Sequence, residues 1–165
     1  MTGVLTAGAP GLWDWSLAVY AHPGVPAACL EAQDRHGAYV NLLLWAAWLG
    51  AVHGHLLTPG EAAGAEAATS AWRQDVVRPL RALRRRLKFG PSPAPDPATA
   101  ALREKIKAAE LEAERIELAR LEGLVPAPRR DAAPQHALAA NLALLLGQAA
   151  PSVVAAFRDT AALPE

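Results

Sequence analysis

Proline and glycine divide this chain into segments that begin and end as helices do. The apolar segment 12–21 is followed directly by the sequence HPG, which predicts a short helix that stops there. Pro26 then suits the first turn of a second helix, and Gly37 suits the residue just after its end. No segment alternates apolar and polar residues convincingly, as a half-buried strand would, so the pattern favours helices alone.

The segment 38–52 carries apolar side chains on every side of the helix that it predicts. Such a helix must be surrounded by protein, so we expect it to be the central, most buried element, with Gly54 ending it. Its apolar run from Leu42 to Val52 is about half of the ~20 residues that a transmembrane helix requires, which favours a core helix. Two further apolar segments, 135–149 and 152–162, predict the last helices.

Two helix starts are marked by capping residues. Thr58 is followed by a proline and, three residues on, by Glu61, which is the pattern of a capping box. Asp96 is followed by a proline in the same way. These starts predict two long helices, over residues 59–88 and 97–122, joined by the proline-rich loop PSPAPDP.

Pro79 falls inside the first long helix, where it removes one backbone hydrogen bond and collides with the preceding turn. We therefore expect a kink between Asp75 and Arg78, or a break at which Pro79 opens a new helix. Because the loop between the two long helices is short, we expect them to pack as antiparallel neighbours.

Together these segments predict an all-α fold, a compact bundle of five to seven helices. Residues 59–88 and 97–122 are expected to form a long antiparallel helical hairpin, which could project from the body. Residues 1–10 are expected to form a flexible arm and residues 11–165 a single domain, which is long enough to bury a core.

The segment Trp72–Lys88 is the most strongly charged part of the chain. It holds six arginines and one lysine against Asp75 alone, whereas the whole chain has a formal net charge of zero. On a helix, five of its cations fall on the flank of an apolar stripe that begins at Trp72. The predicted partner-binding residues are Trp72, Arg78, Arg81, Arg84, Arg85 and Lys88.

Two interpretations of this arginine face stay open. Arginine binds phosphates and carboxylates through paired N–H donors, so the face suits an anionic or acidic partner. The following helix is rich in glutamate, however, and ion pairs of Arg81 or Arg85 with Glu110 or Glu114 would neutralise the face within the chain. Glu110, Glu114 and Glu117 share one flank, which we interpret as a solvated helix surface.

The five tryptophans lie in the first half of the chain and suggest a second candidate site. Trp13 and Trp15 point to opposite sides of one helix, so one of them is expected to pack inward. Asn41 lies in apolar surroundings and needs a hydrogen-bond partner, for which a neighbouring helix is the expected source. The candidate pocket, completed by histidines, consists of Trp13, Trp15, Tyr39, Asn41 and Trp45.

The sequence offers no recognised catalytic or metal-binding pattern. His53 and His55 are two residues apart, which is a poor spacing for ligands on one helix face, and no Glu-x-x-His pair occurs. Cys29 is the single cysteine, and its apolar context favours a small core residue over a nucleophile. We therefore assign no catalytic residue, no metal and no cofactor.

Four segments, in this order, resemble the proteobacterial family known as domain of unknown function 2390: LWDWSLAVYAHPGV, GAYVNLLLWAAWLG, WRQDVVRPLRALRRRLK and LREKIKAAELEAERIELARLE. The resemblance covers residues 11–122. It implies an all-helical, cytoplasmic bacterial protein, and it carries over no catalytic residue.

We therefore expect a non-enzymatic cytoplasmic adaptor or regulatory protein that binds an anionic or acidic partner through the arginine face, or that self-associates. The expected partner is another protein or a second copy of the chain. Nucleic acid is a weaker alternative, because aromatic residues do not alternate with the arginines and the isoelectric point is about 7.0. A peripheral anionic membrane is another weak alternative. The competing function is a small helical enzyme or ligand-binding protein that uses the tryptophan-lined pocket.

Overall fold

The computed structural model describes residues 8–158, and every regular element in them is helical. The all-α prediction is therefore confirmed for this part of the chain. Most of the flexible N-terminal arm predicted for residues 1–10 lies outside the described residues. The end of the last predicted helix, residues 159–162, also lies outside them.

The helices follow one another through short connections, and three of them pass directly into a segment of different pitch. In chain order, the elements are α1 (Leu12–Tyr20), α2 (Val25–His36), α3 (Val40–Trp48), the π-helix η1 (Leu49–His53), α4 (Pro59–Trp72), the π-helix η2 (Arg73–Val77), α5 (Arg78–Arg86), α6 (Pro97–Glu122), α7 (Pro134–Leu146), the 3-10 helix η3 (Gly147–Ala149) and α8 (Ala150–Arg158).

Both predicted caps are present. The Thr58 hydroxyl accepts a hydrogen bond from the backbone N–H of Glu61 (3.1 Å), and the Glu61 carboxylate accepts one from the backbone N–H of Thr58 (2.8 Å). Asp96 and Thr99 make the equivalent reciprocal pair at the start of α6. These bonds satisfy backbone donors that the first turn of a helix leaves free, so α4 and α6 start where the sequence predicts.

The core is centred on α3 and η1. Every residue from Leu42 to Gly50 is buried, and this segment packs against α1, α2, α6 and α7. Gly50 lets η1 approach α7 closely, because a Cβ atom on Gly50 would lie only 2.3 Å from the backbone nitrogen of Leu138. The apolar side chains around this contact form one continuous core cluster.

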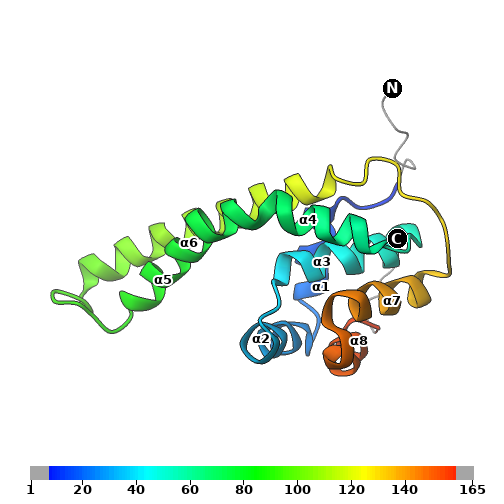
Figure 1. The fold of residues 1–165 in the computed structure, drawn as a ribbon. Coiled ribbons are helices and arrows are strands. Elements are labelled where there is room, and N and C mark those ends of the chain that lie inside the picture. Colours follow the sequence, from blue (N-terminus) through cyan, green and yellow to red (C-terminus); the bar gives the residue numbers. More distant parts are fainter. Residues whose placement is uncertain (1–7, 159–165) are drawn as a thin grey trace.

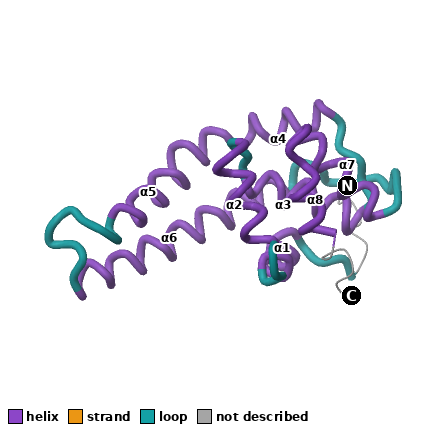
Figure 2. The backbone as a smooth tube through the Cα atoms, turned by 90° about the horizontal axis from the view of Figure 1, so that it is seen from below, coloured by secondary structure: helices purple, strands orange, loops and turns teal. Residues whose placement is uncertain are grey.

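The helices α5 and α6 extend away from this core. Figures 1 and 2 show α5 and the adjoining half of α6 side by side, projecting beyond the other helices, with residues 87–96 connecting them. We call α5, residues 87–96 and the N-terminal half of α6 the arm, and the remaining helices the body. No residue of α5 is buried, so the arm is a thin, two-helix structure rather than a second core.

The segment Pro134–Arg158 has the length and composition of a helix that could cross a membrane. In the structure, Gly147 adopts a positive φ of 56° and ends α7 earlier than predicted, and α7 and α8 then pack against each other. Leu138, Leu142 and Phe157 are fully buried. Core helices share this length and composition, so the segment is weak evidence for a membrane span.

Candidate functional site

The turn before Pro79 is wider than an α-helix. Pro79 has no backbone N–H, so in a regular helix the carbonyl four residues earlier would lose its partner. The chain widens into the π-helix η2 over Arg73–Val77, and Pro79 then lies in the first turn of α5. The chain stays helical from α4 through η2 into α5, so a widened turn accommodates Pro79 in place of the predicted break. One inserted residue rotates the following side chains by about 100° around the helix axis, which changes the face that α5 presents.

Arg73 lies at the junction of the body and the arm and is only 4 % exposed. Its Nε donates to Glu117 Oε1 (3.1 Å), Nη1 to Glu66 Oε1 (3.0 Å) and Nη2 to Thr69 Oγ1 (2.7 Å). Its guanidinium carbon also lies 3.8 Å from the centre of the Tyr39 ring. A buried charge is tolerated only when it is paired in this way, so Arg73 anchors η2 to the body.

Glu117 connects three elements at the same junction and is only 2 % exposed. One of its carboxylate oxygens accepts from Arg73, and the other accepts from Asn41 Nδ2 at 3.0 Å. This is the hydrogen bond to a neighbouring helix that was predicted for Asn41. The interpretation of Glu110, Glu114 and Glu117 as a solvated surface is wrong, because Glu110 and Glu117 are buried against the arginines of η2 and α5.

Arg81 and Arg84 are paired with glutamates of α6. Arg81 Nε donates to Glu110 Oε1 at 2.9 Å, Arg81 Nη2 pairs with Glu114, and Arg84 also pairs with Glu110. The predicted pairing of Arg81 with Glu110 and Glu114 is confirmed. Burial by itself would raise the pKa of Glu110, but hydrogen bonds from Arg84 and Arg81 outweigh it and hold the pKa below its ordinary value. Burial raises the pKa of Glu114 above its ordinary value, and the charge of Arg81 does not fully oppose it.

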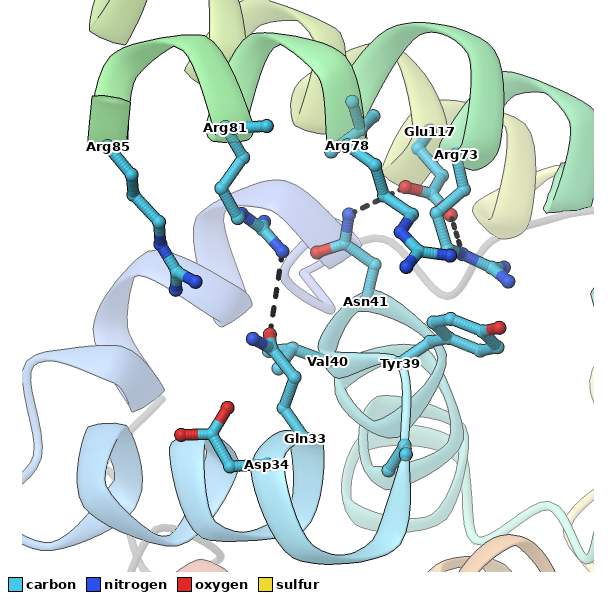
Figure 3. A pocket seen from close by; sticks show the side chains of 14 residues that line it. Gln33, Asp34, Tyr39, Val40, Asn41, Arg73, Arg78, Arg81, Arg85 and Glu117 are labelled. Carbon is cyan, nitrogen blue, oxygen red and sulfur yellow. Dashed lines mark hydrogen bonds and ion pairs between the residues drawn. The ribbon is translucent and has the colours of Figure 1, made fainter. Parts of the chain in front are cut away.

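A cleft of about 540 Å³ opens between the arginine face and the body. Figure 3 shows Arg78, Arg81 and Arg85 reaching from α5 toward α2 and the start of α3. The polar side chains that line the cleft are Gln33, Asp34, Tyr39, Asn41, Arg73, Arg78, Arg81, Arg85 and Glu117.

Arg78 and Arg85 are the cleft arginines that form no ion pair with any residue in the 8–158 range, and both are exposed. Arg81, between them, is held by its glutamates and by a 3.4 Å hydrogen bond from Nη1 to Gln33 Oε1 across the cleft. Two carboxylates line the cleft, Asp34 and Glu117. Glu117 is paired with Arg73, whereas Asp34 forms no ion pair among the described residues. The unpaired charge of the cleft is therefore mainly positive.

A second cavity of about 360 Å³ adjoins the cleft. The two cavities share Arg81 and Arg85 from α5, together with Gln33, Val40 and Asn41. The far side of the second cavity is formed by α1, α2, α3 and α6 and is mostly apolar, with Glu110 and Glu114 of α6 as its carboxylates, both paired with arginines of α5. Its apolar lining consists of Trp13, Leu17, Tyr20, Leu30, Leu44, Leu111 and Leu118.

The predicted partner-binding residues are divided by the structure. Arg78, Arg81 and Arg85 line the cleft, whereas Arg84 lines the second cavity and not the cleft. Two of the predicted residues line neither cavity. Trp72 is half-buried and donates from Nε1 to the backbone oxygen of Ala113 (2.9 Å), and the Lys88 ammonium lies 5.3 Å from the centre of the Phe89 ring.

The predicted tryptophan pocket does not form as one site. Tyr39 and Asn41 line the cleft, and Trp13 lines the second cavity together with Asn41. Trp15 and Trp45 are instead core residues, because the inward sides of α1 and α3 face the centre of the body. None of the described histidines lines either cavity.

His55 has a structural position that the sequence did not suggest. Its side chain is fully buried; Nδ1 accepts from the backbone N–H of Arg129 (3.1 Å), and Nε2 lies 3.3 Å from Glu61 Oε2. These contacts fasten the connection before α7 to the first turn of α4. Within residues 8–158, no three His, Cys, Asp or Glu side chains lie close enough to hold a metal ion.

The single cysteine is also part of the core. Cys29 is fully buried on α2, and burial raises the pKa of its thiol to about 12. A thiol in this state is a poor nucleophile at neutral pH, because the thiolate is the reactive form. The predicted core position of Cys29 is therefore confirmed.

The residues that sequence reasoning missed are Arg73, Glu117 and Gln33. A signal for Arg73 was available, because Glu66, Thr69 and Arg73 follow one another at helical spacing and so share one face of the helix predicted over residues 59–88. For Glu117 and Gln33 no local signal exists, since their partners lie 44 and 48 residues away in sequence.

The geometry of residues 8–158 defines an all-helical fold with an arginine-lined polar cleft between α5 and the body. The model of one family, described as Protein of unknown function (DUF2390), matches residues 11–121. This is more than half of the chain, so the chain belongs to that family, as the resemblance of its four segments implied. The matched range contains both walls of the cleft. No curated protein and no solved structure matches the chain.

Proposed function

We propose that the protein is a non-enzymatic cytoplasmic adaptor or regulatory protein that binds an acidic segment of a partner protein in the cleft. The observation that carries this proposal is the pair Arg78 and Arg85. Both face the cleft without an ion-pair partner among the described residues, while Arg73 and Arg81 are held by glutamates. The cleft thus offers two available guanidinium groups on a wall that is fixed by its neighbours.

The spacing of these two arginines favours a chain of carboxylates over a single small anion. Arg78 and Arg85 are seven residues apart on α5, which corresponds to about 10 Å along the helix axis. A bidentate pair uses both oxygens of one carboxylate on one guanidinium, so two arginines at this spacing are matched by two carboxylates. Two acidic side chains of one extended or helical segment can meet both, and rotation of α5 is opposed by the Arg81 and Arg84 ion pairs.

The predicted antiparallel hairpin of residues 59–88 and 97–122, within a compact bundle, is part of this proposal. It is supported by the Trp72–Ala113 hydrogen bond and by the Arg73–Glu117 and Arg81–Glu110 ion pairs, which join the two long segments along their length. In this role the hairpin is a rigid support that keeps the arginine face opposite α2 and α3.

The test is binding of a fluorescein-labelled decaglutamate peptide, followed by fluorescence anisotropy at low salt, with decalysine as the control peptide. The double variant Arg78→Glu/Arg85→Glu should lose at least tenfold in affinity, because it reverses both available charges. Arg86→Glu is the matched control, since Arg86 is exposed on the same helix and lines neither cavity. No binding of decaglutamate, or an equal loss in the Arg86 variant, would contradict the proposal.

A further inference from the structure

We infer that the acidic partner segment carries a bulky apolar side chain and that this side chain occupies the second cavity, beside Arg85. The inference rests on the proposed function and names the chemistry of the partner. The segment would place carboxylates on Arg78 and Arg85 and a leucine or an aromatic residue between α1, α2 and α6.

The first support is the apolar rim of the second cavity. Leu17 and Leu30 are each 50 % exposed and Leu111 is 51 % exposed, although all three line the cavity. Clustered apolar side chains around a recess are typical of protein-binding sites, where one buried anchor residue contributes much of the affinity. A recess of this kind admits a protruding side chain, whereas a flat membrane surface would not enter it.

The second support is a polar side chain in the wall of the same cavity. Ser16 lines the cavity and is only 4 % exposed, and its hydroxyl has no hydrogen-bond partner among the described residues. The oxygen itself is enclosed, so the Ser16 side chain has to rotate before a ligand in the cavity can reach it. A tryptophan or tyrosine anchor would then donate its N–H or O–H to that oxygen and satisfy a buried polar group.

The third support is the common wall of the two cavities. Arg85 is exposed, unpaired in the described part of the chain, and lines both of them. Arg81 also lines both, but its bonds to Glu110, Glu114 and Gln33 hold it in the wall. A single segment therefore passes from the cationic cleft to the apolar cavity across Arg85, with charge complementarity on one side and apolar contact on the other.

The experiment is selection of a random peptide library displayed on phage against the full chain. The expected result is enrichment of peptides that combine Asp or Glu with Trp, Tyr, Phe or Leu. A synthetic copy of the dominant peptide should bind Leu30→Gln and Leu111→Gln at least fivefold more weakly than the wild-type protein. Leu102→Gln is the matched control, because Leu102 is 49 % exposed on α6 and lines neither cavity.

Decaglutamate separates this inference from the proposed function. The neutral substitutions at Leu30 and Leu111 should leave decaglutamate binding unchanged, since that peptide has no apolar side chain. Enriched peptides without the acidic and apolar combination, the absence of any enrichment, or equal binding to Leu30→Gln and the wild type would overturn the inference while the decaglutamate result stood. If the wild-type protein did not bind decaglutamate, the proposed function itself would be contradicted.

Discussion

The body and the arm of this protein are held together by different forces. In the body, Trp45, Leu49 and their neighbours are fully buried in one apolar cluster, and η1 touches α7 at backbone distance. In the arm, α5 buries no residue, and its contact with α6 depends on the ion pairs of Arg81 and Arg84. The body is therefore stabilised by removal of apolar surface from water, whereas the arm combines little apolar burial, at Ile106, with ion pairs that set the register of α5 on α6.

This difference explains why the candidate site lies where it does. The arginines that fix the arm and the arginines that are available to a partner lie on the same helix, one turn apart. The body supplies the opposite, rigid wall of the cleft through α2 and α3. The charged cleft and the neighbouring second cavity both lie where these two regions meet.

The largest expected effect of a single substitution is in the body, at Gly50. A Cβ at this position would approach three backbone atoms of α7 to within 2.6 Å, and backbone atoms cannot move aside as a flexible side chain can. Gly50→Ala should therefore lower the free energy of unfolding by at least about 3 kcal/mol in urea denaturation. Gly64→Ala on α4 is the control: a Cβ there meets no atom within 4 Å, so we expect stabilisation of about 0.5–1 kcal/mol. If both variants lost stability equally, close packing of η1 on α7 would be wrong.

A smaller effect is expected at the junction of the two regions. Glu117→Ala would leave Arg73 buried with Glu66 as its remaining carboxylate and would free Asn41 of its partner. We expect a loss of about 2–3 kcal/mol, because a buried guanidinium would keep one of its two carboxylate partners and lose the more deeply buried one. The double variant Arg73→Met/Glu117→Leu should recover part of this loss. Equal stability of Glu117→Ala and the wild type in thermal unfolding would show that the junction does not depend on the buried pair.

The smallest expected effect is in the arm, where Glu110 and Glu114 should respond in opposite directions. The pKa of Glu110 is lowered, so its ionised form is favoured by the fold, and Glu110→Gln should lose about 1 kcal/mol at pH 7. The pKa of Glu114 is raised, so its ionised form is disfavoured, and Glu114→Gln should be neutral or slightly stabilising. Urea denaturation, with amide hydrogen exchange of α5, measures both.

The pH dependence of these two variants has a definite sign. Glu110 contributes its full stability above the ordinary glutamate pKa of about 4.3, and this contribution is lost as the pH falls through its lower folded pKa. The cost of ionised Glu114 disappears as the pH falls through its raised folded pKa. Both variants should therefore converge on the wild-type stability at a pH below both folded pKa values. A loss in Glu110→Gln that persisted at that pH would exclude the ion pairs as its cause.

Local sequence signals predicted those features whose causes are local. The capping residues Thr58 and Asp96 determine where α4 and α6 begin, and Pro79 determines where α5 begins. The burial pattern along the two long segments could not be predicted in the same way. A projection at 100° per residue assumes a regular helix, whereas η2 inserts one residue, so the face of α5 cannot be projected from Trp72 across η2.

The candidate site combined two predictions that had been made separately. The arginine face and the Tyr39–Asn41 part of the tryptophan pocket turned out to be opposite walls of one cleft. The pattern of residues along α5 does not predict where α2 lies, because the position of α2 depends on the packing of the whole body. The burial of Glu110 and Glu117 was missed for the same reason. The sequence alone does not show which arginines cover these two glutamates, so they were expected to be solvated.

The burial of Cys29 makes the protein convenient for distance measurements in solution. With a thiol pKa of about 12, on the order of one molecule in 100,000 would carry the thiolate at pH 7, and the sulfur is enclosed by the core. The natural chain should therefore react only very slowly with maleimide reagents in its folded state. A pair of cysteines introduced on the solvent sides of α2 and α5 would accept spin labels or fluorophores without removal of the native cysteine, and the width of the cleft could then be followed directly while a peptide binds.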